Sequence, residues 1–250
     1  MTDESQIIPE GTPDNPLAIG VPGGPPSVLL PLSVLRRTTA HHMREQLGTV
    51  APVTVFSEVD TTAAAACRER HRAAIESTVR VPLTYMPLFI QATVAALKAV
   101  PVLNSRLTED GHHIERTIHL GMATSVYGGV LMPVVRHAET KSLAELAVEV
   151  QRLAEAARWG QLTADDQHGH TFCITNQGRW GRTLYGTPTI KSPNVGILAF
   201  ETIRPRPVAL HGQVVVRPMM YISLTFDHRA LDGSEAAQFM GAVQDYLEAL

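Results

Sequence analysis

Hydrophobic and polar positions alternate with two different periods along this chain of 250 residues. Apolar residues that recur every three to four positions indicate a helix, and strict alternation indicates a strand. The segment Ser142–Trp159 is predicted to be an amphipathic helix, and Met86–Val100, apolar nearly all round, a buried one. Three further helices are predicted: one between the candidate N-cap Ser33 and Gly48, then Thr62–Thr78 and Ser234–Leu250.

Strands are predicted where β-branched residues alternate with polar ones, as in Val53–Asp60. Two short strands should flank the Asp110-Gly111 turn within Asn104–Arg116. The other predicted strands are His119–Thr124, Val130–Val135, Thr171–Thr175, Val195–Phe200, Gln213–Val216 and Met219–Phe226. Helices and strands are mixed without strict alternation, which favours an α+β fold, or a mixed sheet with helices on one side.

Residues 1–31 stand apart from the rest, because they hold seven prolines and four glycines. Such a segment cannot form a helix or a central strand. Two interpretations stay open: a disordered tail, or an extended arm laid on a neighbouring subunit. Residues 32–250 are expected to form one domain.

Composition excludes several classes of protein. A net charge of −3 and a pI near 6.4 give no electrostatic footprint for nucleic acid. No apolar run is long enough for a membrane span, and no signal peptide is recognisable, so a cytoplasmic location is expected. The two cysteines predict no disulfide framework, and the histidine pairs lack the carboxylates or cysteines that would complete a metal site.

Candidate chemistry lies at the end of the last predicted strand, in Asp227-His228-Arg229, and in the turn Asp232-Gly233 that precedes the last helix. A histidine at a strand end can face a cleft, and imidazole is a natural general base near neutral pH. The spacing His-x-x-x-Asp-Gly alone is weak, because a histidine beside an aspartate at a strand-to-helix turn is more often a capping arrangement.

That segment resembles the signature of the dihydrolipoamide acyltransferases of 2-oxo acid dehydrogenase complexes, whose fold and motif chloramphenicol acetyltransferases share. The resemblance covers roughly residues 28–250 and implies an α+β, chloramphenicol acetyltransferase-like fold: a mixed sheet with helices packed on it, in a homotrimer. Further motifs follow in family order: LSVLRRTTAHHM from Leu32, PVLNSRL from Pro101, EDG from Glu109, LMPVVR from Leu131, KSLAEL from Lys141, FCITNQG from Phe172 and PNVGIL from Pro193.

The resemblance also implies roles for individual residues. His228 matches the catalytic histidine, which takes a proton from the acceptor, and Thr175 matches the hydroxyl residue that hydrogen-bonds the tetrahedral oxyanion. Asp232 matches a structural carboxylate paired with an arginine, for which Arg36 is a candidate. Sites would lie between subunits, so His228 and Thr175 would come from different chains. The co-substrate would be a coenzyme A thioester, most simply acetyl-CoA, without a metal or an acyl-enzyme.

Three departures from the family pattern modify this expectation. None of the three lysines has the context of a lipoylated lysine, and no apolar C-terminal segment of the complex-forming relatives follows Leu250, which predicts a stand-alone enzyme and a free trimer. The loop after Thr175 carries bulky polar residues that could hold an anionic acceptor, although a solvated loop is an equally good interpretation. These residues are Arg179, Trp180, Arg182 and Tyr185.

The function expected from these features is acetyl transfer from acetyl-CoA to a hydroxyl of a small molecule, for example a tetronate-type intermediate of specialised metabolism. One alternative is a dihydrolipoamide acyltransferase core whose lipoyl domain is on another chain. A second is a non-catalytic structural trimer, against which the presence of His228, Thr175 and Asp232 argues.

Overall fold

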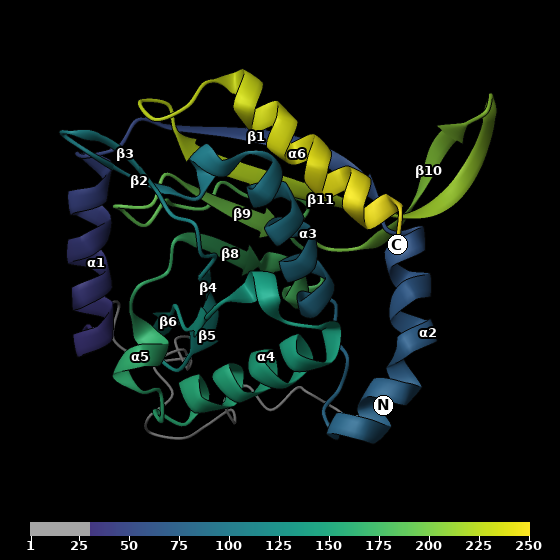
Figure 1. Ribbon diagram of the computed structural model, residues 1–250, viewed down its shortest axis with the longest axis horizontal. Helices are drawn as coiled ribbons and strands as arrows, with labels where there is room; N and C mark the ends of the chain where they lie inside the picture. The colour runs from purple at the N-terminus through teal and green to yellow at the C-terminus, as the bar shows by residue number, and fades with distance from the viewer. Residues whose placement is uncertain (1–30) are drawn as a thin grey trace, which may run out of the picture.

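The computed structural model describes residues 31–250, so the arm or tail predicted for residues 1–31 lies almost entirely outside the described part. A mixed sheet runs through the molecule in the order β1-β11-β9-β8-β4-β7, with β10 paired to β11 (Figure 1). Its strands are β1 (Pro52–Asp60), β4 (Leu120–Met122), β7 (Val134–Val135), β8 (Phe172–Asn176), β9 (Gly196–Phe200), β10 (Arg204–Leu210) and β11 (Gln213–Asp227). Two hairpins lie outside it: β2 (Ser105–Thr108) with β3 (Gly111–Ile114), and β5 (Thr124–Val126) with β6 (Gly129–Leu131).

Helices surround this sheet, and two of them cover one of its faces (Figure 1). These two, α3 and α6, pack against each other, while α1 stands at one side of the molecule and α2 at the other. The α-helices are α1 (Val34–Leu47), α2 (Thr62–Val79), α3 (Met86–Ala99), α4 (Leu143–Arg158), α5 (Ala164–Gln167) and α6 (Gly233–Glu248). The α+β class and the mixed sheet predicted from the sequence are therefore confirmed.

The core lies between that sheet face and helices α3 and α6. Phe89 of α3 stacks on Phe200 of β9, with ring centroids 4.1 Å apart, and Phe172 of β8 contacts Phe239 of α6 at 5.6 Å. The helix α3 buries ten residues, as its all-round apolar pattern predicted. Burial of such side chains is worth roughly 1.5–3 kcal/mol each, so this layer dominates the stability of the fold.

The structure corrects the prediction for the last strands. Gln213–Val216 and Met219–Phe226 are not separate strands but parts of the continuous β11, and β10 was not predicted. Pro218 lies between the two predicted strands, yet it pairs with Pro205 of β10, and its carbonyl accepts a hydrogen bond from the N–H of Thr61. A proline is tolerated in a sheet where the ladder needs no N–H at its position.

The predicted strands between residues 119 and 135 are also shorter than expected. His119–Thr124 begins as β4 and continues into the separate hairpin strand β5, while Val130–Val135 is divided between β6 and β7. The turn of that hairpin contains Gly128, whose φ of 81° lies in the left-handed region that glycine adopts without strain. The segment between the two predicted strands thus forms the turn of a hairpin, but the strands are shorter than predicted.

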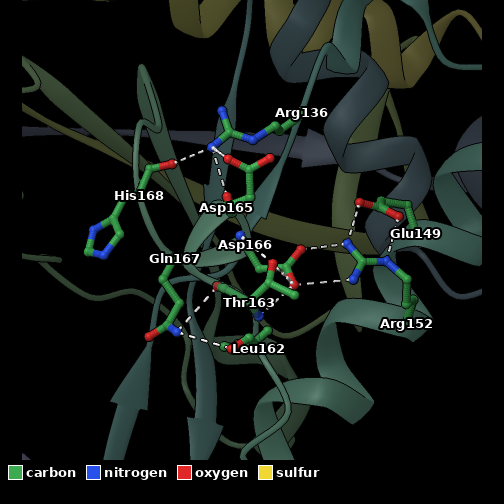
Figure 2. A network of polar contacts seen from close by, with 9 residues as sticks. All are labelled: Arg136, Glu149, Arg152, Leu162, Thr163, Asp165, Asp166, Gln167 and His168. Atoms are coloured by element: carbon green, nitrogen blue, oxygen red, sulfur yellow. Dashed lines mark hydrogen bonds and ion pairs between the residues drawn. The ribbon is translucent and has the colours of Figure 1, made fainter.

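A polar network fixes the segment that leads into β8 (Figure 2). Arg152 of α4 pairs with Asp166 of α5 at 2.7 Å, and Arg136 donates hydrogen bonds to the carbonyl oxygens of Asp165 and His168. The Arg152 guanidinium and the Thr163 hydroxyl and N–H hold the pKa of the nearly buried Asp166 carboxyl well below its usual range, despite the opposing effect of burial. The network therefore anchors the start of β8, the strand that carries Thr175.

Candidate active site

The imidazole of His228 lies where β11 ends, one residue after Asp227. The His228 backbone N–H donates a hydrogen bond of 2.8 Å to the carbonyl of Ala51, which fixes the chain at this point against the residue before β1. The His228 side chain is 45% exposed and packs beside the ring of Phe226, with centroids 5.6 Å apart. The histidine is thus held by the backbone while its ring stays accessible to a substrate, as the strand-end position predicted.

An ion pair between the buried Asp227 and the half-exposed Arg229 supports this strand end, and the sequence interpretation missed it. Asp227 is 2% exposed and receives a bidentate contact from Arg229, with Nη2 to Oδ2 at 2.6 Å and Nε to Oδ1 at 3.0 Å. The N–H groups of Ala51 and Arg229 also donate to Asp227 Oδ1. Burial alone would raise the pKa of this carboxyl, but these donors outweigh it and the pKa is lowered. The adjacent Asp227-His228-Arg229 triplet was the available signal.

Asp232 takes a different position from the one expected. Its carboxylate lies 3.6 Å from His228 Nδ1 and is 80% exposed, and its backbone N–H donates to Glu235 Oε2 at 3.1 Å. It stands at the N-terminus of α6. Within the described part of one chain no ion pair joins Asp232 to Arg36. The arginine next to this turn, Arg229, pairs with Asp227 instead. The expected Asp232–Arg36 pair is therefore not formed within the chain.

Thr175 lies near the end of β8, on the sheet face that α3 and α6 do not cover. Side chains alternate between faces along a strand. Ile174 of β8 belongs to the main core, whereas Cys173 packs in a small cluster with Ile197 of β9 on the other side. Thr175 shares the side of Cys173, and it is level with Ala199 of β9. Thr175 is half-buried.

The sheet register separates Thr175 from His228. Thr175 is level with Ala199, and Ala199 is level with Ser223 of β11, five residues before His228. At about 3.3 Å per residue and about 4.8 Å per strand, the two residues are roughly 19 Å apart. A general base and an oxyanion donor must both lie within hydrogen-bonding distance of one reacting group. The two residues of a single chain therefore cannot both contact one reacting group.

The loop after β8 covers the Thr175 face of the sheet. Tyr185 is 62% exposed and contacts the rings of Phe56 and Tyr221 edge-on, at 5.6 and 6.0 Å. Arg182 is exposed in the same loop. The side chains of Arg179 and Trp180 lie outside the described residues. The structure thus places Tyr185 on the side of the sheet that carries Thr175, and Arg182 lies exposed in the same loop.

A cysteine, a histidine and an asparagine also meet near β8, but their protonation does not suit nucleophilic catalysis. His170 Nδ1 lies 2.7 Å from Asn194 Nδ2 and 3.6 Å from the sulfur of Cys173. Burial raises the pKa of the Cys173 thiol to about 12 and lowers that of His170 to about 4. The thiol is fully buried, so it is a packing residue.

Neither a metal centre nor a membrane span is apparent in residues 31–250. No three histidine, cysteine, aspartate or glutamate side chains gather there in a way that could hold a metal ion. Of the helices described, none combines the length and the apolar character needed to cross a bilayer.

Comparison with known proteins identifies the family. The sequence profile of the catalytic domain of 2-oxoacid dehydrogenases acyltransferase matches residues 25–250. The chain belongs to this acyltransferase family. The dihydrolipoyllysine-residue succinyltransferase component of the 2-oxoglutarate dehydrogenase complex from Bartonella vinsonii subsp. berkhoffii is 37% identical over 217 residues, covering 87% of this chain and 53% of the relative. The chain thus spans about half the length of this curated relative. Its family makes it a coenzyme A-dependent acyltransferase.

Solved structures agree with this assignment. A probable dihydrolipoamide acetyltransferase from Listeria monocytogenes superposes with a TM-score of 0.86 at 30% identity, covering 90% of this chain and 95% of the other. Dihydrolipoamide acetyltransferase from Azotobacter vinelandii superposes with 0.84 at 32% identity, covering 91% and 97%. A chloramphenicol acetyltransferase, at 18% identity and a TM-score of 0.53 over 82% of this chain and 94% of its own, shares the fold alone.

The Azotobacter structure bears on the candidate residues as well. It concerns the role of one serine, one histidine and one asparagine in the catalytic mechanism of that enzyme. The asparagine follows the histidine by four positions, as Asp232 follows His228, and the serine precedes it by about fifty, as Thr175 does here. This acyltransferase therefore has threonine and aspartate at the spacings where that relative has serine and asparagine.

Proposed function

We propose that this acyltransferase moves an acyl group between coenzyme A and the thiol of a dihydrolipoyl group, with His228 as general base and Thr175 as oxyanion donor. The observation that carries the proposal is the accessible imidazole of His228, held at the end of β11 by its backbone bond to Ala51 and by the adjacent Asp227–Arg229 pair. The relatives named above act on dihydrolipoyl groups, which supports this acceptor over the small hydroxyl compound expected from the sequence.

The reaction proceeds by direct transfer. With Nδ1 of His228 turned toward Asp232, Nε2 removes the proton from the acceptor thiol, whose sulfur attacks the thioester carbonyl carbon. The carbonyl π electrons move to oxygen, and the Thr175 hydroxyl donates a hydrogen bond to the oxyanion. The intermediate then collapses, the bond to the coenzyme A sulfur breaks, and the imidazolium returns its proton to the departing thiolate. Neither cysteine takes part, which agrees with the buried, protonated state of Cys173.

The proposed assembly is a closed ring of copies, most simply the trimer implied by the family resemblance. A separation of roughly 19 Å within a chain excludes a site built from one copy alone. A symmetric ring places His228 of each copy against Thr175 of its neighbour at every interface. Each interface then holds one complete site.

The identity of the transferred acyl group is a separate part of the proposal. We propose succinyl first, because the Bartonella relative is a succinyltransferase, with acetyl as the alternative represented by the Listeria and Azotobacter enzymes. A second candidate acceptor, the hydroxyl of a small anionic molecule, is favoured by the exposed Arg182 and Tyr185 on the Thr175 face. The His228 chemistry is the same for either nucleophile.

One experiment separates these candidates. Succinyl-CoA and acetyl-CoA are each offered with dihydrolipoamide and with a panel of hydroxylated acids that includes tetronates, and products are identified by mass. Transfer to dihydrolipoamide, faster from succinyl-CoA, is the expected result. Transfer only to a hydroxyl would establish the second acceptor class, and transfer to no acceptor would overturn both.

A further inference from the structure

A carboxyl group is buried without a partner next to the Thr175 end of the sheet. Glu201 follows β9 directly and is 2% exposed, and neither of its carboxylate oxygens has a hydrogen-bond partner among the described residues. The hydroxyls of Thr202 and Ser223 are equally buried and unpartnered. Groups of this kind cost free energy when they are left unsatisfied, so their retention requires an explanation.

The loop that follows Thr175 packs against the main chain of Glu201 and Thr202. Gly178 lies so close to the Glu201 carbonyl that a Cβ there would approach it within 2.2 Å. The Thr202 N–H donates to the carbonyl of Thr183 at 3.3 Å, and Arg204 Nη2 donates to that of Gly181 at 2.9 Å. The loop of residues 177–186 therefore rests on Glu201 and Thr202, and Glu201 is enclosed beneath it.

Sheet register places Glu201 beside Thr175. Thr175 is level with Ala199, and Glu201 lies two residues beyond Ala199 on the same side of the sheet. The two side chains are therefore diagonal neighbours on adjacent strands, roughly 8 Å apart at their Cβ atoms. Any displacement of the loop at Glu201 is passed to the end of β8, because the loop begins there.

The surroundings of Glu201 favour its neutral form. The titratable and charged side chains on the neighbouring strands are Tyr221, Arg204 and the Glu58–Arg206 pair beside Tyr221, and those of the loop are Arg182 and Tyr185. The Glu201 carboxyl has a hydrogen bond to none of them. Burial raises the pKa of Glu201, and the nearby Gly186 N–H and Ser223 hydroxyl offset this only in part, since neither reaches hydrogen-bonding geometry.

We infer that Glu201 is a positioning residue, whose buried carboxyl holds the loop of residues 177–186 against the sheet and so fixes Thr175 for catalysis. The inference rests on the role proposed for Thr175. The neutral acid fills its enclosure without needing a counter-charge. Ionisation would place an uncompensated charge beneath the loop and release it. Raised pH should therefore loosen the loop in the native protein.

Loop order can be measured without any substrate. The chain has two tryptophans, Trp159 and Trp180, and Trp180 belongs to this loop. A Trp159→Phe background, which changes a 76% exposed residue at the end of α4, leaves Trp180 as the only indole reporter. Its emission is followed from acid through neutral to alkaline pH in this background, with Glu201 intact, with Glu201→Gln, and with the exposed Glu155→Gln as a matched control.

The expected result is a transition on raising the pH that Glu201→Gln abolishes and Glu155→Gln preserves. Any decline in kcat that accompanies this transition should also be absent from Glu201→Gln, while Glu201→Ala should lower kcat about tenfold or more through misplacement of Thr175. Superimposable emission curves for Glu201 and Glu201→Gln would overturn the inference, as would an unchanged kcat in Glu201→Ala. If no acceptor is acylated, the proposed function fails, and the emission curves still decide whether Glu201 holds the loop.

Discussion

The two ends of the central sheet are built in different ways. The end that carries His228 is held by contacts within the chain: β11 passes into α6 through a short turn, and the buried Asp227 carboxylate binds both Arg229 and the N–H of Ala51, next to β1. The end that carries Thr175 is covered by a loop, and an unpaired carboxyl is buried beneath that loop. One half of the proposed site is therefore fixed by polar contacts around a strand end, whereas the position of the other half depends on a loop.

The largest effect is expected when two inactive variants are mixed, which tests whether His228 and Thr175 of different copies form one site. His228→Ala should lower kcat by about 10²–10⁴-fold through loss of the general base. When His228→Ala and Thr175→Val chains are unfolded and reassembled together, about a quarter of the interfaces in a closed ring should pair an intact histidine with an intact threonine. Activity should then reappear in the mixture, measured as acyl transfer.

Each variant reassembled alone is the control and should stay inactive. A mixture without recovered activity, in which mass spectrometry confirms mixed oligomers, would contradict a site shared between copies.

Thr175→Val tests the loop-covered end on its own. Loss of one oxyanion donor should lower kcat by about 10²–10³-fold and leave KM nearly unchanged, because the bond strengthens in the transition state. Thr175→Ser keeps the hydroxyl and is the matched control, which should retain most of the activity. Equal kcat values for the valine and serine variants would remove Thr175 from the mechanism.

Asp227→Asn tests the rigidity of the other end. The change replaces a buried carboxylate, which accepts several hydrogen bonds, by a neutral amide that can accept fewer. We expect a loss of about 1–3 kcal/mol in the free energy of unfolding. Because the folded-state pKa of Asp227 is lowered, its stabilisation is present at neutral pH and disappears as pH falls below about 4. The free energies of unfolding of Asp227→Asn and wild type, measured by urea unfolding, should therefore approach each other in acid.

The exposed Asp245→Asn on α6 is the control for that measurement and should match wild type throughout. If the difference in the free energy of unfolding between Asp227→Asn and wild type grew in acid, the stabilisation could not come from the ionised Asp227 carboxylate.

Asp232→Asn should have the smallest effect. Its carboxylate is 80% exposed and 3.6 Å from His228 Nδ1, and exposed ion pairs of this kind are weak. We expect kcat to fall by no more than a few-fold, with the pH profile little changed. A loss comparable with that of His228→Ala would show that Asp232, rather than the Asp227–Arg229 pair, orients the imidazole.

Local pattern predicted the elements whose burial follows from their own sequence. The apolar α3, the amphipathic α4 and the strand end at His228 were all recognisable, because periodicity reports burial directly. The β10 strand was missed because its two prolines argue against a strand, and only the register opposite Pro218 makes them acceptable. Asp227–Arg229 was missed because the family signature draws attention to the later Asp232.

The site as a whole was less predictable than its parts. A sequence shows neither that Thr175 and His228 lie at opposite ends of one sheet nor that Glu201 is enclosed, since both depend on the pairing of β8, β9 and β11. The roles of His228 and Thr175 came from a resemblance, and they stay predictions until the variants above are measured.

The unbroken β11 has a mechanical consequence. One strand of 15 residues, roughly 50 Å long, begins in the ribbon it forms with β10, which projects from the body, and ends next to the catalytic histidine (Figure 1). Because β11 is one continuous strand, a displacement or a twist of that ribbon also moves its other end, next to His228. A protein that bound the ribbon would therefore change the position of the catalytic imidazole.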